Sequence, residues 1–123
     1  MALFRKMNSR SIFAVALGLV LFAGCSKSSG LLGNFVPKEV VTIAAATKGP
    51  SDLLFNLEGK LVEKCPVAGC WFYLEDQTGR IKVDTKSAGF VVLNVPLGAR
   101  VQVAGKVIHE GAEAIIGAQG LRF

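Results

Sequence analysis

Short stretches in which apolar and polar residues alternate are the feature of this sequence that most limits its fold. From Val40 to the C-terminus, no stretch keeps an apolar period of 3.6 residues over three turns, whereas several keep a period of two. A period of two is typical of β-strands with one buried face, because successive side chains point to opposite sides. We therefore expect strands over residues 53–63, 70–75, 80–84, 100–108 and 113–123. The side chains expected inside are Phe55, Leu57, Leu61, Phe72, Leu74, Ile81, Val83, Val101, Val103 and Val107.

The order and spacing of these strands predict an all-β fold, a small five-stranded Greek-key barrel of the OB type. The longest connection, residues 85–99, separates the third strand from the fourth and has room for only a short helix. Gly59 in the first strand indicates a bulge or sharp bend, and residues 98–107 resemble the fourth strand of an OB barrel. Another small barrel or a sandwich is the alternative. Residues 40–47 fit either a strand or a helical lead-in.

Residues 1–24 differ from the rest of the chain and predict a signal peptide. They contain basic but no acidic residues, followed by an apolar run over 12–23, which is the layout of a secretion signal. The next Phe-Ala-Gly-Cys sequence resembles a bacterial lipobox, in which Cys25 is lipidated and becomes the mature N-terminus. Acyl chains such as palmitate on Cys25 would hold the protein at a membrane. An uncleaved anchor with an incidental Cys25 is the alternative.

The leader also changes how the charge and the domain limits are interpreted. Three of the 14 basic residues and none of the nine acidic residues lie in it, so the net charge falls from +5 to +2 without it. We expect residues 25–39, whose first part is rich in Ser and Gly, to be a flexible tether, and residues 40–123 to be the folded domain. Ser26, directly after Cys25, favours the outer membrane in a bacterium with two membranes, so the domain would face the periplasm.

Three short motifs point to a more specific resemblance. They are Cys-Pro-Val-Ala-Gly-Cys-Trp at 65–71, Gly-Phe at 89–90 and Gly-x-x-Val-x-Val-x-Gly at 98–105. Together they are similar to a family of small bacterial secreted and lipoprotein OB-like domains of unknown function, which commonly has a Cys-x4-Cys-Trp element. The similarity covers about residues 53–110. It implies an OB-like fold in the cell envelope and no particular activity.

The two cysteines of this element, Cys65 and Cys70, are the first candidate for chemistry. They enclose four residues at the expected tip of a hairpin, so a structural disulfide is within reach in an oxidising compartment. A redox switch is a second interpretation, although a thioredoxin-like site has two residues between its cysteines. A third is a copper or zinc site, since both metals accept sulfur and imidazole. His109, the only histidine, would join it from the loop after the fourth strand.

The second candidate is a possible ligand face on the outside of the barrel. Trp71 and Tyr73 share one side of the second strand, and Arg80 and Lys82 project outward from the third. Aromatic and basic groups together are used to bind single-stranded nucleic acid. However, acidic residues on the same strands, the small net charge and the envelope location argue against nucleic acid as a partner. A solvated face with its aromatics packed under the N-terminal segment is the simpler expectation.

Catalysis has no comparable support in the sequence. We find no Ser/His/Asp arrangement and no glycine-rich phosphate loop, and a single histidine limits general-base chemistry. The sequence therefore predicts a non-enzymatic, membrane-tethered binding or interaction module, with a soft metal ion at the cysteine pair as one option. The alternatives are a purely structural or assembly lipoprotein with a Cys65–Cys70 disulfide that contacts another envelope protein, and a minor thiol-redox accessory protein.

Overall fold

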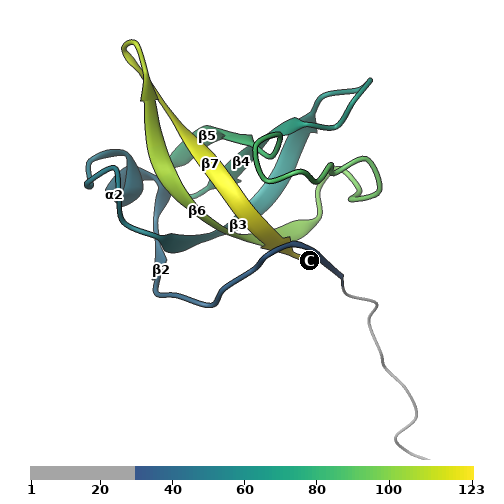
Figure 1. The fold of residues 1–123 in the computed structure, drawn as a ribbon, viewed down its shortest axis with the longest axis horizontal. Coiled ribbons are helices and arrows are strands. Elements are labelled where there is room, and N and C mark those ends of the chain that lie inside the picture. Colours follow the sequence, from purple (N-terminus) through teal and green to yellow (C-terminus); the bar gives the residue numbers. More distant parts are fainter. Residues whose placement is uncertain (1–29) are drawn as a thin grey trace, which may run out of the picture.

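The computed structural model describes residues 30–123, so the signal peptide 1–24 and the lipidation at Cys25 lie outside the described residues. Figure 1 shows a curved β-structure with one short helix. The elements are β1 (Leu31–Gly33), β2 (Val40–Val41), α2 (Ile43–Thr47), β3 (Phe55–Lys64), β4 (Trp71–Asp76), β5 (Gly79–Asp84), β6 (Arg100–Glu110) and β7 (Glu113–Arg122). Among residues 30–123, no helix is long and apolar enough to cross a membrane.

Five of the strands form a closed barrel, which confirms the predicted all-β, OB-like fold. β3 pairs with both β4 and β6, β4 pairs with β5, and β6 pairs with β7, all antiparallel. A short parallel contact between β5 and β7, at Val83↔Ile116 and Asp84↔Gly117, completes the ring. The register of β3 against β4 shifts between Leu61 and Glu63. This irregularity lies two residues beyond Gly59, the position at which the sequence predicted a bulge or bend.

The barrel interior contains all ten side chains that the alternation placed there, each at most 6% exposed. Two parts of the chain without clear alternation add to this core. Val92 and Val95 enter it from the long connection, and Ile43 and Ala46 enter it from α2. Burying one large aliphatic side chain contributes about 1.5–3 kcal/mol, so these additions are a substantial part of the stability of a small domain.

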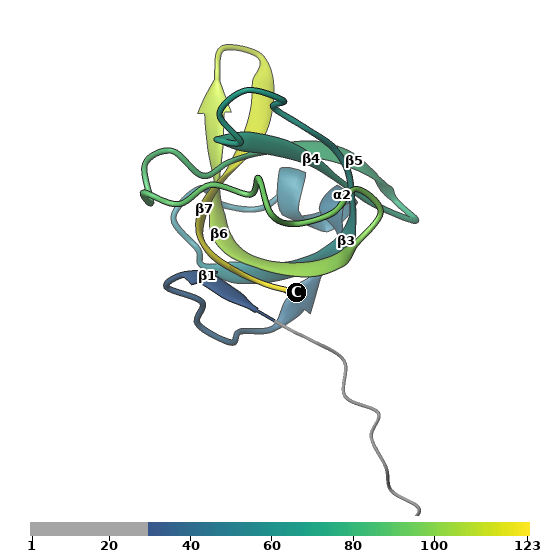
Figure 2. The same ribbon diagram turned by 90° about the vertical axis from the view of Figure 1, so that its right-hand side faces the viewer.

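The short helix that the sequence allowed in the connection 85–99 is absent from it, and the helix in this structure is α2, before the barrel strands. Figure 1 and Figure 2 together show α2 at one end of the barrel, over the opening of the ring of strands, and its apolar side chains join the core from there. Thr42 begins the helix, since its hydroxyl accepts a hydrogen bond from the Ala45 N–H at 3.1 Å. The sequence left residues 40–47 open between strand and helix, and the structure contains both, a two-residue strand followed by a one-turn helix.

Residues 30–41, before α2, are part of the fold, which corrects the predicted tether over residues 30–39. β1 pairs with β7 along the part of its edge that β5 leaves free, and β2 pairs with β3 along the part that β4 leaves free. Between them, the buried side chain of Asn56 accepts from the Lys38 N–H and donates to the Val36 carbonyl. A Cβ at Gly120 would lie 2.3 Å from the backbone of Asn34 and Phe35. Glycine therefore permits a close crossing of chains here.

Asp76 connects the β4–β5 turn to α2. One carboxylate oxygen accepts from the Ile43 N–H at 2.9 Å, and the other accepts from the Thr78 N–H, the Thr78 hydroxyl and the Gly79 N–H. Partial burial by itself would raise the pKa of Asp76. The hydrogen bonds from Thr78, Ile43 and Gly79 outweigh burial and lower this pKa below its usual value.

We expect Asp76→Ala to lower the free energy of unfolding by about 1.5–3 kcal/mol, because it removes hydrogen bonds to a charged group and leaves N–H donors unpaired. Asp52→Ala, at an exposed position, is the matched control and should leave stability unchanged. Because the charged form of Asp76 accepts these bonds, its contribution is complete above the usual Asp pKa and is lost as the pH falls toward the lowered folded-state pKa. Urea unfolding at neutral pH and at pH below the usual Asp pKa measures both effects. Equal losses for the two variants would contradict this role.

Candidate functional site

The outer side of the β4–β5 hairpin brings together the four residues of the predicted ligand face. Tyr73 lies directly opposite Lys82 in the sheet, and Glu75 lies opposite Arg80. The Trp71 and Tyr73 rings meet edge to face with centroids 5.9 Å apart. The Arg80 guanidinium carbon lies 4.6 Å from the Tyr73 centroid, and the Lys82 ammonium lies 5.5 Å from the Trp71 centroid. We call Trp71, Tyr73, Arg80 and Lys82 the cation–aromatic face.

Glu63 of β3 fixes the position of one of the two cations. Its carboxylate pairs with the Arg80 guanidinium at 2.5 Å, and both side chains are about half exposed. Exposed ion pairs of this kind contribute only about 0–1 kcal/mol to stability. The main effect of the pair is therefore to hold the Arg80 guanidinium over the Tyr73 ring. Within residues 30–123, Lys82 forms no ion pair, so its charge is available to a ligand.

The N-terminal segment does not cover this face, contrary to the sequence-based expectation. Figure 2 shows β1 on the far side of the barrel from β4 and β5. The segment instead pairs with the free edges of β7 and β3, where its backbone groups form hydrogen bonds. The rings of Trp71 and Tyr73, both half-buried, pack against each other and against the two cations.

The thiol loop, residues 65–70, joins β3 to β4 at the edge of this face. The Cys65 N–H donates to the Trp71 carbonyl at 3.1 Å, and the preceding pair is Lys64↔Phe72. Cys65 is thus across from Trp71, while Cys70 lies within the loop. Neighbouring positions of a strand point to opposite sides, so the two cysteines are not a cross-strand pair. Both are free thiols in this structure, and the disulfide stays one of the three interpretations of the pair.

The backbone of the loop surrounds the Cys65 sulfur with N–H groups. The Ala68 N–H contacts Sγ at 3.4 Å. Hydrogen bonds from the backbone of Ala68, then Val67 and Gly69, lower the pKa of Cys65 to about 7, although burial acts in the opposite direction. A ring of amide groups of this kind stabilises an anion. At neutral pH, a large fraction of Cys65 is therefore the thiolate, which is the nucleophilic form of this side chain.

Lys64 holds the long connection 85–99 against the thiol loop. Its ammonium donates to the carbonyl oxygens of Val92, Leu93 and Val95 at 3.4, 2.8 and 2.6 Å. The Val92 N–H also donates to the Gly69 carbonyl at 2.9 Å. Sequence reasoning missed Lys64, because a lysine at the end of a strand normally indicates a solvated position. No local signal marked it, because its carbonyl partners lie 28 to 31 residues further along the chain.

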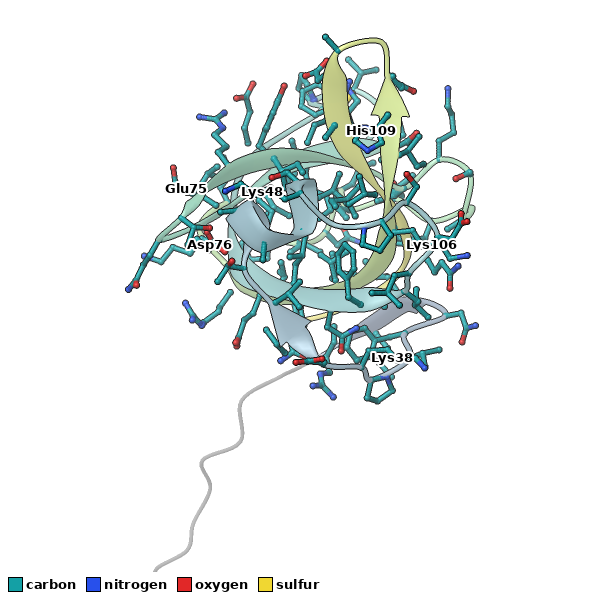
Figure 3. All side chains as sticks on the ribbon, turned by 90° about the vertical axis from the view of Figure 1, so that its left-hand side faces the viewer. Lys38, Lys48, Glu75, Asp76, Lys106 and His109 are labelled. Atoms are coloured by element: carbon teal, nitrogen blue, oxygen red, sulfur yellow. The ribbon has the colours of Figure 1, made fainter. Side chains whose placement is uncertain are left out.

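His109 does not join the cysteines, which corrects the predicted three-ligand metal site. It lies exposed on the β6–β7 hairpin, paired with Ala114 (Figure 3). It has the same parity as the buried Val107, but the hairpin extends past the barrel at this point, so no core lies beneath it. Among residues 30–123, no group of three Cys, His, Asp or Glu side chains is placed to hold a metal ion.

The two open hollows of about 640 Å³ lie away from the cation–aromatic face. One is beside His109 and Lys106, and the other is between β2 and the β4–β5 turn, with Glu58 and Arg100 in its wall. Neither includes Trp71, Tyr73 or Lys82. The face is thus an exposed sheet surface, suited to an extended partner. It does not resemble the enclosed concave pockets that hold small molecules.

Comparison with known proteins identifies the fold alone. No family model matches the chain, and no curated protein does. Among solved structures it is similar to the hypothetical protein YgiW from E. coli, with a TM-score of 0.54 and 21% sequence identity. The match covers 72% of this chain and 96% of YgiW. It agrees with an OB-like barrel of a small bacterial type and assigns no activity.

We expect Cys65 to be alkylated by iodoacetamide several-fold faster than Cys70 at neutral pH, because only its sulfur lies among backbone N–H groups. The rate at Cys65 should rise with pH around a midpoint of about 7. Peptide mass spectrometry after timed labelling locates the adducts, and Cys65→Ser and Cys70→Ser isolate each thiol. Equal rates at the two positions, or a Cys65 midpoint well above neutral pH, would show that the loop does not stabilise the thiolate.

Proposed function

We propose that this protein is a lipoprotein of the bacterial envelope whose OB-like barrel binds a partner through the cation–aromatic face, without catalysing a reaction. The observation that supports this function best is the alternation of two rings and two cations on an exposed sheet surface. Trp, Tyr and Arg are the residues most enriched at the energetic centres of protein interfaces. Their presence together on a solvent-exposed strand pair favours a binding role over a purely structural one.

The charge of the face indicates what kind of partner it would take. Lys82 has no ion-pair partner within the described part of the chain, whereas Arg80 pairs with Glu63, and Glu75 and Asp84 lie beside the two cations on the same strands. Lys82 is therefore the cation of this face that is free to pair with a partner. We infer that the partner is another envelope protein that presents acidic side chains beside an apolar group. The acid would approach Lys82 and the apolar group would pack on Trp71. A lipoprotein that only assembles with neighbouring proteins through other surfaces is the alternative.

Thiol chemistry at Cys65 is a second candidate function. The observation that favours it is the low pKa of Cys65, since the thiolate is both the nucleophile and the ligand for soft metals. With Cys70 in the same loop, copper(I) or a disulfide-bearing partner could engage both sulfurs, provided that the loop rearranges to turn Cys70 toward Cys65. The binding role needs no such rearrangement, and we therefore place it first.

The lipid anchor is tested by the mass of the mature N-terminus. Mass spectrometry of membrane-extracted protein should find acyl groups on Cys25 and none of residues 1–24. Cys25→Ala should prevent both acylation and cleavage, so that neither acyl mass at position 25 nor a mature form that begins there is found. Processing of Cys25→Ala together with undiminished membrane retention would contradict the anchor.

The binding face is tested by photo-crosslinking in the producing bacterium. A benzophenone amino acid at position 82 should capture a protein of discrete mass, whereas the same probe at exposed position 110, on the β6–β7 hairpin, should not. Tyr73→Ala should abolish the adduct, since loss of a central aromatic residue costs about 2 kcal/mol, or about 30-fold in affinity. Glu113→Ala, exposed on β7, is the matched control and should leave the adduct intact. Equal capture from positions 82 and 110, or an unchanged adduct in Tyr73→Ala, would contradict the assignment.

A further inference from the structure

The structure greatly shortens the distance between the proposed lipid anchor and the barrel. The sequence suggested a tether of residues 25–39, which could extend about 50 Å. Because Gly30 is already bound to the barrel, only five peptide steps separate it from Cys25, a reach of about 17 Å at full extension. A domain on so short a connection stays beside the membrane. This inference rests on the proposed acylation of Cys25.

Gly30 is firmly attached to the end of the barrel. Its N–H donates to the Phe123 carbonyl at 2.7 Å, and the Phe123 N–H donates back to the Gly30 carbonyl at 3.0 Å. A Cβ on Gly30 would lie 2.7 Å from the Phe123 ring, so the ring packs directly on the backbone. The surface around this attachment point must therefore be the part of the barrel nearest to the acyl chains.

This surface, which we call the β1 face, consists of Leu31, Phe35, Pro37, Lys38 and Arg122. It surrounds a hollow of about 450 Å³, lined by all of these residues except Lys38 together with Gly30. Leu31, in the paired strand β1, is 66% exposed. The Arg122 guanidinium lies 4.7 Å from the centroid of the Phe35 ring. Figure 3 shows Lys38 on the opposite side of the molecule from His109.

The composition of the β1 face matches the chemistry of a lipid headgroup layer. Lys38 and Arg122 are exposed, and neither forms an ion pair among residues 30–123. Arg122 contacts only the neutral side-chain oxygen of Gln102 and the Phe35 ring. Glu39 is the one acidic neighbour in this segment. Basic residues are attracted to an anionic leaflet, and an exposed leucine is stabilised by contact with the acyl boundary.

We propose that the anchored protein lies with its β1 face against the headgroup layer of the membrane that holds Cys25. β1 and the β4–β5 hairpin are on opposite sides of the barrel (Figure 2). The cation–aromatic face is then directed away from the bilayer, toward proteins of the surrounding compartment. The short connection restricts the domain to this orientation, and the exposed leucine and the two cations stabilise it.

The test uses the fact that Trp71 is the only tryptophan. The acylated, processed protein is reconstituted into vesicles of phosphatidylethanolamine and phosphatidylglycerol that contain a lipid with a nitroxide near the headgroup. Native Trp71, on the far side, should keep its fluorescence. In Leu31→Trp combined with Trp71→Phe, the introduced indole should lose most of its fluorescence, because nitroxides quench only at short range. Position 31 is exposed, so this substitution should preserve the fold.

The outcomes separate the orientation from the anchor. If mass spectrometry finds no acyl group and the protein does not sediment with vesicles, the proposed anchor is wrong. If the protein is acylated and sediments but both indoles are quenched equally, the orientation is wrong and the anchor stands. Lys38→Gln with Arg122→Gln should reduce quenching at position 31 in phosphatidylglycerol vesicles and leave Trp71 unchanged. Unchanged quenching at position 31 would contradict the contribution of the two cations.

Discussion

The closure of the barrel by β7 is the interaction on which the rest of this structure depends. β7 pairs with β6 over nearly its whole length, and its other edge is shared between β5 and β1. The β5 contact is only two residue pairs long, so the ring is completed over a very short distance. On its other side β7 lies very close to β6, since a Cβ on Gly105 of β6 would lie 2.6 Å from the Gly117 carbonyl oxygen. Without that closure, β5 and the hairpin it forms with β4 would have a free edge in place of a partner strand.

The candidate site is a consequence of this arrangement. Because β4 and β5 are held from both sides, their inner residues fill the core and their outer residues present a rigid surface. The cross-strand register then sets Lys82 beside Tyr73 and near Trp71, and the salt bridge from β3 positions Arg80 over Tyr73. At the edge of the same surface, the thiol loop ends at the Cys65–Trp71 backbone contact. A nucleophilic sulfur therefore lies next to the proposed binding residues.

Much of the fold and part of the site could be predicted from the sequence, and the errors have physical causes. The alternation of side chains along a strand is a local property, and it correctly placed four residues on the outer face: Trp71, Tyr73, Arg80 and Lys82. Whether the two cysteines face each other depends on where the hairpin loop closes, which the sequence does not specify. With Cys65 opposite Trp71, a one-residue offset separates the thiols. The prediction that His109 joins a three-ligand metal site was wrong, because the alternation along a strand does not show how far that strand extends beyond the barrel.

The sequence by itself determined which residues are inside and how many strands build the barrel, because each strand has its own alternation of apolar and polar residues. Only the tertiary structure decided the fate of residues 30–41. The Ser- and Gly-rich stretch just before them extended the predicted tether to residue 39, yet β1 and β2 complete the free edges of β7 and β3, strands that come later in the chain. Lys64 and Asn56 likewise acquire their partners only when the distant segments 92–95 and 36–38 fold against them. The unpaired backbone groups at a strand edge form hydrogen bonds with any segment that lies close enough. Which segment lies close enough depends on the folded arrangement of the whole chain.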